Sequence, residues 1–331
     1  TWGIPGTMCG LAAAGVLYIL LSLFITLRGN SILERVLPTV VTGPVIMVIG
    51  LILAPVAVNM ALGKTGDGSA VLVPEKTALI VSMISLATTI LVSLFGKGVM
   101  RLIPIIFGIV AGYLVSLAFG LVDFSPVREA PWLAVPQFVL PEWNLKAIMF
   151  IVPVAIAPAI EHFGDILAIS SVTGKNYLQK PGVNKTMLGD GLATSLASVL
   201  GGPPNTTYSE VTGAVALLKV RNPGIMTWAA LCAIALAFVG KVGAILLTIP
   251  VPVMGGIMIL LFGTIMVVGV NSLVKAQVDL MQSRNMVIVA LIVVLGIGGM
   301  SFSAGEFTME GIGLAGIAGV VLNLILPGRH G

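Results

Sequence analysis

The sequence predicts an all-α polytopic membrane protein, and its composition and the length of its apolar runs carry this prediction. Of the 331 residues, 57% are hydrophobic and only 9% are charged, whereas about a quarter of the residues in a soluble domain are charged. Mean hydropathy is +1.11. Runs of about 20 apolar residues, the length a helix needs to cross the hydrocarbon core, follow one another with only short connectors between them.

The apolar runs divide into eleven segments, which we expect to be the membrane helices. They cover residues 8–27, 38–61, 77–95, 100–121, 146–170, 187–200, 210–220, 226–247, 251–274, 286–301 and 307–326.

Two of these segments, 187–200 and 210–220, are too short to cross a bilayer alone. The residues between them, 201–207, read Gly-Gly-Pro-Pro-Asn-Thr-Thr, which is incompatible with a regular helix. We therefore expect a break at membrane depth, with a short strand at Thr206–Tyr208 before a half-helix. A membrane tolerates such a strand only where another segment pairs with it, and the chain offers no obvious partner.

The basic residues predict the orientation. Alternating the connectors between two sides places five of the 17 Lys and Arg residues on one side, and 17 − 5 = 12 on the other. The five are Lys64, Lys76, Arg128, Lys146 and Lys241. Because the side richer in Lys and Arg is cytoplasmic, we expect residue 1 outside and the C-terminus in the cytoplasm.

A faint internal repeat is also present. Residues 38–43 and 250–255 share Pro, Val and Gly at matching spacing and open two segments that the alternation runs in opposite directions. Inverted repeats are typical of secondary transporters, which bind their substrate near the midplane. Coincidence between two helices rich in Gly and Pro is the competing interpretation.

Four acidic residues lie inside apolar segments. The sequence has 13 Asp and Glu residues, nine of them in connectors, so 13 − 9 = 4 remain. These four are Glu161, Asp165, Asp190 and Glu210. An ionisable group in the membrane costs several kcal/mol, so it normally marks a substrate or proton path, with structural pairing as the alternative.

Glu161 and Asp165 share one face of a helix because they are four residues apart. Desolvation and like charge both favour protonation of at least one of them, which is the chemistry of a proton-coupled carrier. His162 points off this face and is expected to be a hydrogen-bonded packing residue. Glu210 opens the half-helix, where free backbone N–H groups favour an anion or a polar ligand.

The sequence offers no nucleophile–base constellation, phosphate loop or metal-ligand cluster, so no catalytic residue, metal site or cofactor is predicted. The pI of about 9.2 comes from residues in short connectors and not from a continuous basic stripe, which argues against a nucleic-acid partner. An anion channel or a membrane enzyme is a further hypothesis. The acidic character of the intramembrane charges suits neither.

Two stretches resemble the signature regions of the nucleobase-ascorbate transporter family. They are Ala-Ile-Glu-His-Phe-Gly-Asp at 159–165 and Gly-Pro-Pro-Asn-Thr-Thr-Tyr-Ser-Glu-Val-Thr-Gly at 202–213. Bacterial uracil permeases are the most similar members. The resemblance implies proton-coupled uptake of uracil or a related nucleobase, with the lipid bilayer and the base as partners and with homodimers through one domain.

The resemblance also implies fourteen spans in two inverted repeats of seven, arranged as core and gate domains. The first predicted span matches the fourth of the family, so the family's first three spans are not represented. We expect residues 1–28 and 146–247 to belong to the core domain, and 29–145 and 248–331 to the gate domain. The strand that the family pairs with the one before its tenth helix lies in its third helix.

By position, Glu161 and Glu210 match the carboxylates that hydrogen-bond the base in uracil permeases, and Tyr208 and Ser209 would contribute backbone groups. Uracil presents two N–H donors and two carbonyl acceptors, which carboxylates and backbone N–H groups together can read.

Asp165 departs from the His of uracil permeases and is similar to the Asp of members that carry xanthine or uric acid, so those purines are the alternative cargo. Those members have Gln and Asn in place of Glu210 and Val211, which favours uracil here. Asp190 matches a position that ties core helices together. Glu161, Asp165 and Asp190 form the expected proton-coupling set.

Overall fold

The structure, a computed structural model, describes residues 2–29, 37–208, 212, 215–216, 219, 221–304 and 307–327. Within these residues it contains thirteen α-helices, two short helices of other types and one two-stranded hairpin. This confirms the predicted class. Helices α1, α3, α4 and α13 are each long and apolar enough to cross a membrane, and five shorter helices are also apolar.

The chain forms two compact units. The first comprises residues Thr1–Ile52, Gln137–Ala216 and Ile265–Gly331, and the second comprises Leu53–Pro136 and Leu217–Thr264. Helices α3 (Thr39–Ala61) and α13 (Val251–Lys275) each contribute residues to both units. The predicted core and gate domains are divided differently along the chain and stay a prediction.

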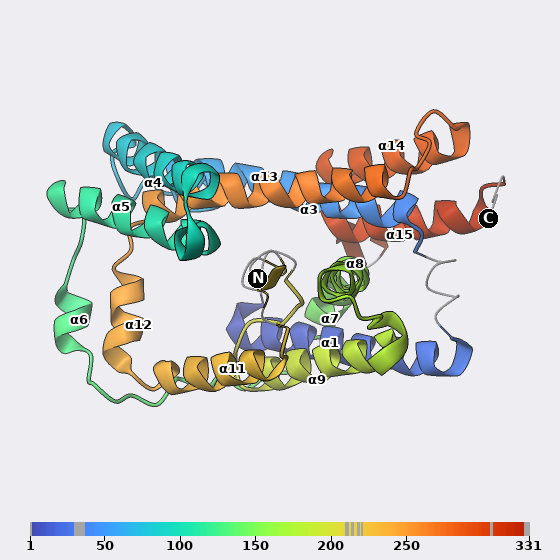
Figure 1. Cartoon of the computed structure of the whole chain (residues 1–331), viewed down its shortest axis with the longest axis horizontal. Coiled ribbons are helices and arrows are strands. Elements are labelled where there is room, and N and C mark those ends of the chain that lie inside the picture. The colour runs from blue at the N-terminus through green and yellow to red at the C-terminus, as the bar shows by residue number, and fades with distance from the viewer. Residues whose placement is uncertain are drawn as a thin grey trace. The chain divides into compact units, whose positions relative to one another are not determined.

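The first unit also contains six helices, the π-helix η2 (Leu178–Gly182) and a hairpin of β1 (Ser301–Ala304) and β2 (Phe307–Glu310) (Figure 1). The six helices are α1 (Gly3–Arg28), α7 (Leu145–Val154), α8 (Ile156–Thr173), α9 (Val183–Val199), α14 (Ser283–Ile297) and α15 (Gly311–Ile325). One apolar cluster joins α3, α14 and α15 through Val41, Val45, Ile288, Ile292 and Ala315.

The second unit contains five helices and the 3-10 helix η1 (Gly98–Leu102). The five helices are α4 (Glu75–Phe95), α5 (Pro104–Ala118), α6 (Ser125–Glu129), α11 (Gly224–Ala237) and α12 (Gly240–Leu247). Val81, Val253 and Ile257 form its buried apolar cluster. The Ser85 hydroxyl donates to the Gly108 and Val253 carbonyls at 3.0 and 3.2 Å, which joins α4 to α5 and α13.

The segments predicted as 146–170 and 226–247 are each two helices. The first breaks at Ala155, between α7 and α8, because Pro153 and Pro158 lack the backbone N–H that a continuous helix needs. The second breaks at residues 238–239, where Val239 has an extended backbone.

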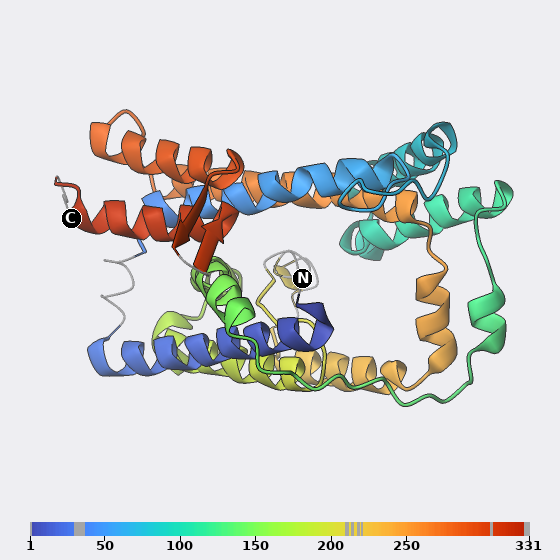
Figure 2. The same ribbon diagram turned by 180° about the vertical axis from the view of Figure 1, so that it is seen from behind.

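The end of the chain differs from the prediction. We expected helix over 286–301 and 307–326, but α14 ends at Ile297, Gly299 takes a φ of +70°, and the antiparallel hairpin β1–β2 precedes α15. The hairpin lies beside the start of α15 (Figure 2). Two consecutive glycines at 298–299 end the helix, since glycine adopts positive φ without steric cost.

The repeat sequences at 38–43 and 250–255 have matching places in the structure. Gly43 near the start of α3 faces Leu273 and Gly269 near the end of α13, and Gly255 near the start of α13 faces Met60 and Ala61 at the end of α3. The two helices are therefore antiparallel, as predicted. Each repeat glycine allows the partner helix to approach closely.

Candidate functional site

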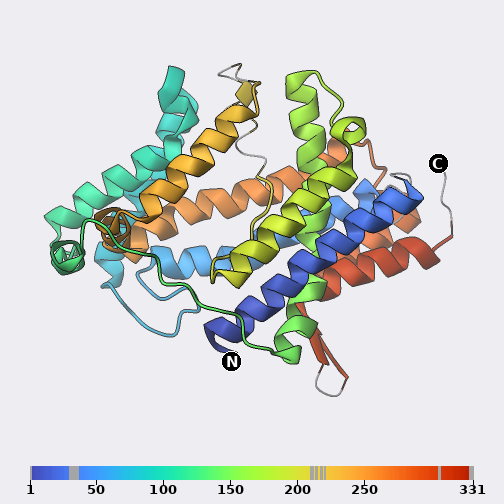
Figure 3. The same ribbon diagram turned by 90° about the horizontal axis from the view of Figure 1, so that it is seen from below.

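The site is built on α1, α8 and α9 of the first unit. Helices α1 and α9 run side by side (Figures 1 and 3), and they approach closely at two glycines. A Cβ atom on Gly15 would lie 2.6 Å from the Ser195 backbone nitrogen and 2.7 Å from the Gly191 carbonyl oxygen. Only glycine at this crossing lets the two backbones come so near.

Helix α8 buries one face against its neighbours. Ala159, His162 and Ile166 are buried on it, as is Ala155 just before its first residue. Ala155 and Ala159 join an apolar cluster with Ala14 and Tyr18 of α1 and Met187 of α9. This cluster fixes the start of α8 against both helices. It thereby determines where the α8 carboxyl groups lie.

The two predicted carboxyl groups of α8 have different environments. Asp165 is buried, with 7% of its surface exposed, whereas Glu161 is partly exposed. They lie one turn apart, as their spacing requires. The more accessible Glu161 is therefore the better placed of the two to meet a ligand.

Asp190 of α9 meets His162 of α8. The His162 Nδ1 lies 3.3 Å from the Asp190 Oδ2, and 1% and 6% of the two side chains are exposed. The His162 Nε2 lies 3.0 Å from the Thr186 hydroxyl. His162 is thus a buried residue with a hydrogen-bonded ring nitrogen, and Asp190 lies against it across α8 and α9. The roles of Asp190 in tying core helices together and in proton coupling stay predictions.

Tyr18 of α1 is a site residue that the sequence did not single out. It is 3% exposed, and its phenol lies within electrostatic range of both Asp190 and Glu161. In the sequence, Tyr18 is marked only by its hydroxyl group within an otherwise apolar helix. A buried hydroxyl needs a polar neighbour, which is the one sign that it lies near other polar groups. Tyr18 is thus close enough to both carboxyl groups to interact with them electrostatically.

Residues 201–205, which follow α9, are held in place by contacts with Val139 and with α9 itself. Gly201 takes a φ of +83°, and a Cβ atom there would meet the Val139 backbone. The Asn205 side chain donates to the Ala193 carbonyl at 3.1 Å, and the Thr194 hydroxyl donates to the Asn205 carbonyl at 2.8 Å. These bonds fix the start of the second signature against α9.

The short strand predicted at Thr206–Tyr208 is not formed, and residues 202–208 have an irregular backbone. Tyr208 is 49% exposed. The predicted ligands Ser209 and Glu210 lie outside the described residues, as does most of the expected half-helix at 210–220.

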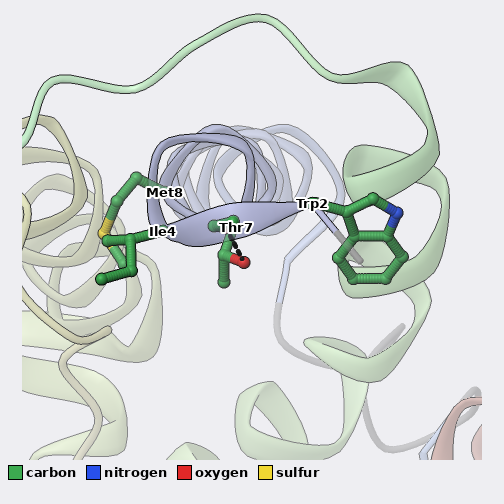
Figure 4. Close-up of a pocket in the computed structure, with 5 residues that line it drawn as sticks. Trp2, Ile4, Thr7 and Met8 are labelled. Atoms are coloured by element: carbon green, nitrogen blue, oxygen red, sulfur yellow. Dashed lines mark hydrogen bonds between the residues drawn. The ribbon is translucent and has the colours of Figure 1, made fainter.

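A surface hollow lies elsewhere in this unit, over the first turn of α1 (Figure 4). Trp2, Gly3, Ile4, Thr7 and Met8 line it, and Glu161, Asp165 and Asp190 are not among the lining residues. The Thr7 hydroxyl donates to the Gly3 carbonyl at 2.8 Å. The hollow is apolar and separate from the site. Within the part of the chain that the structure describes, no group of three or more His, Cys, Asp or Glu residues could hold a metal ion.

Comparison with known proteins identifies the family. Residues 1–305 match the model of the Permease family. The chain is 54% identical over 327 residues to a probable uracil permease of Pasteurella multocida (strain Pm70), with 99% of this chain and 77% of that protein covered. It is 44% identical over 339 residues to a uracil permease of Bacillus caldolyticus (99% and 77% covered). It is 35% identical over 323 residues to one of Escherichia coli (strain K12) (98% and 75% covered). The chain therefore belongs to the Permease family, as a multi-pass nucleobase-ascorbate transporter similar to uracil permeases.

Proposed function

We propose that this protein takes up uracil or a closely related nucleobase across the bacterial inner membrane together with protons. The observation that supports this most is the pair of signature stretches at 159–165 and 202–213, in a chain 54% identical to a probable uracil permease. The first stretch places a partly exposed carboxylate, Glu161, on a helix whose opposite face is buried.

In the proposed site, Glu161 and Glu210 accept hydrogen bonds from the two ring N–H groups of uracil. Backbone groups at Tyr208 and Ser209 meet the carbonyl oxygens. Hydrogen bonds to a charged group contribute about 1.5–3 kcal/mol each, so two carboxylates supply a large part of the binding free energy. The bonds from Asn205 and Thr194 that hold the preceding loop support this arrangement.

Proton coupling rests on the acidic groups that lie within apolar helices. Glu161, Asp165 and Asp190 are the proposed set, because a carboxyl group in a poorly solvated position is readily protonated. The proposal further includes the core domain at 1–28 and 146–247, the gate domain in the remaining spans, and homodimers through the gate. It also places the C-terminus in the cytoplasm. Green fluorescent protein fused to the C-terminus tests this directly, because it becomes fluorescent only on the cytoplasmic side.

A second cargo, xanthine or uric acid, has one observation in its favour. Asp165 stands where uracil permeases have His and where purine carriers have Asp, and it is buried one turn from Glu161. Glu210 weighs against this cargo. A carboxylate only accepts hydrogen bonds, whereas the Gln of the purine carriers also donates.

Uptake of radiolabelled uracil by cells that express the complete coding sequence tests the proposal. Glu161→Gln is expected to reduce the initial rate at low uracil by about 10- to 150-fold, the equivalent of about 1.5–3 kcal/mol. Glu142→Gln makes the same change on an exposed connector residue and is the matched control. A protonophore should abolish accumulation. Equal uptake by the two variants, or accumulation driven by a sodium gradient alone, would contradict the proposal.

A further inference from the structure

The contact between His162 and Asp190 is chemically unusual because neither of its two atoms has a hydrogen-bond partner. The His162 Nδ1 and the Asp190 Oδ2 lie 3.3 Å apart, and both are buried atoms that make no hydrogen bond with any described residue. Leaving a buried polar atom unpaired costs about 1–3 kcal/mol. Both atoms are satisfied together only when a hydrogen lies between them, on Nδ1 facing the carboxylate.

The other ring nitrogen faces a group that can act as donor or acceptor. The Thr186 hydroxyl lies 3.0 Å from the His162 Nε2 and 3.1 Å from the Val183 carbonyl oxygen. A hydroxyl carries one hydrogen and rotates to suit its partners. If that hydrogen points at Nε2, the imidazole is neutral. If it points at the Val183 carbonyl, the hydroxyl oxygen can accept from an Nε2–H group.

The cluster therefore has two protonation states in which every polar atom is satisfied. In the first, a neutral His162 donates from Nδ1 to the Asp190 carboxylate and accepts from Thr186 at Nε2. In the second, one added proton sits on Nε2 and is donated to the Thr186 oxygen, while the hydroxyl hydrogen turns to the Val183 carbonyl. No other bond forms or breaks, and the added proton makes the cluster neutral overall.

We propose that His162 is a proton-binding site of this transporter, held by Asp190 and switched by the rotation of the Thr186 hydroxyl. Asp190 acts here as the partner that fixes the ring and stabilises the imidazolium, a role that carboxylates often have beside histidine. The inference rests on the proposed proton-coupled function. It assigns the proton to a histidine that the sequence suggested only for packing.

The surrounding ionisable groups allow His162 to interact electrostatically with Glu161, the carboxylate proposed to bind the substrate. Helix α8 itself carries Glu161 and Asp165, and α1 contributes Tyr18, whose phenol lies within electrostatic range of Asp190 and Glu161. The other ionisable groups on these elements are Cys9 and Arg28 of α1, Lys146 of α7, Lys185 of α9 and Lys180 of η2. Helix α15 has no Asp, Glu, His, Lys or Arg.

Nitrogen NMR of histidine-labelled transporter tests the site without transport. This sequence has two histidines, His162 and His330, so His162→Gln and the matched control His330→Gln assign the signals. We expect the His162 Nδ1 to stay protonated while Nε2 changes from acceptor to protonated as the pH is lowered over the range in which the transporter stays folded. An Nε2 signal that does not change over this range would overturn the proposal.

Transport in proteoliposomes supplies the second test. One coupled proton corresponds to about a tenfold concentration ratio of substrate for each pH unit imposed. The readout is a ratio of two measurements on the same vesicles: uracil accumulation driven by a pH gradient, and uracil exchange by counterflow, which needs no gradient. A general loss of folded protein lowers both measurements alike and leaves their ratio unchanged. His162→Gln and Thr186→Val should lower it by about tenfold per pH unit, and Thr186→Ser should restore it.

The outcomes separate the two proposals. A ratio in His162→Gln equal to that of the unmodified protein would overturn the role of His162 in coupling. If the NMR signal of His162 Nε2 changes with pH but a pH gradient does not increase uracil accumulation by the unmodified transporter, the proposed proton coupling is wrong and the proton-binding site is supported.

Discussion

At the residue scale, the position of each polar group in the first unit follows from the cost of burying it. The side chains of Asp190 and His162 are nearly inaccessible and lie 3.3 Å apart, whereas Glu161 keeps part of its surface exposed. An ionisable group without a partner is too costly in this environment. The more accessible carboxylate is therefore the one assigned to a ligand that comes and goes.

Thr194 provides a test of the loop that leads to the second signature. It is 1% exposed, and its hydroxyl donates to the Asn205 carbonyl at 2.8 Å. Thr194→Val keeps the shape but removes the donor, so we expect a loss of about 0.5–1.5 kcal/mol in unfolding free energy. Uracil affinity should fall as well, because the loop continues into Tyr208. Thermal unfolding and uracil binding in detergent measure the two effects.

Thr194→Ser is the control for this substitution, since it retains the hydroxyl. It should preserve both stability and affinity. If valine and serine at this position bind uracil equally well, the hydrogen bond does not position the loop.

The sequence was informative about individual residues because charge in an apolar segment is rare. It identified all four intramembrane carboxyl groups, and the structure places Glu161 and Asp165 on α8 and Asp190 on α9, beside His162 of α8. It did not identify Tyr18 or Thr186. Those side chains gain their meaning from helices that are distant in sequence, and helical spacing alone does not report such contacts.

At the scale of elements, the crossing of α1 and α9 depends on small residues. Without a strong hydrophobic force between helices in lipid, close packing stabilises the pair, and small residues allow it. The backbone atoms of Ser195 and Gly191 that a Cβ atom on Gly15 would meet cannot move independently of their helix.

Substitution at this crossing has a predictable cost. Gly15→Ala should destabilise the protein by about 1–3 kcal/mol, the usual range for overpacking. Gly164→Ala on α8 is the control, because Gly164 is exposed and a Cβ atom there meets nothing within 4 Å. That change should be neutral or stabilising, since alanine favours a helix by about 1 kcal/mol over glycine. Equal melting temperatures for the two variants would exclude the close approach.

Helix existence was predicted better than helix ends. The four long spans agree with α1, α3, α4 and α13, because long apolar runs have few alternatives in a membrane. The breaks at Ala155 and at residues 238–239 were missed, although Pro153 and Pro158 already suggested the first of them. The hairpin β1–β2 was missed because short apolar runs do not distinguish helix from strand.

At the scale of the whole molecule, the strongest support for an inverted repeat is the antiparallel pair α3 and α13. The Pro-to-Gly motif of each repeat opens its helix, and the glycine of each motif faces the opposite end of the other helix. Three shared residues in six were weak support in the sequence alone. The reciprocal contacts give the motif a physical reason, since both glycines occupy equivalent crossings.

Binding of radiolabelled uracil to the purified transporter tests the central claim most directly, with unlabelled uracil, thymine, xanthine and uric acid as competitors. We expect unlabelled uracil to displace the label and xanthine and uric acid not to. Glu210→Gln, like Glu161→Gln, should weaken uracil binding by about 10- to 150-fold. Displacement by xanthine at lower concentration than by uracil, or unchanged uracil affinity in both variants, would contradict the assignment of these two carboxylates to a uracil site.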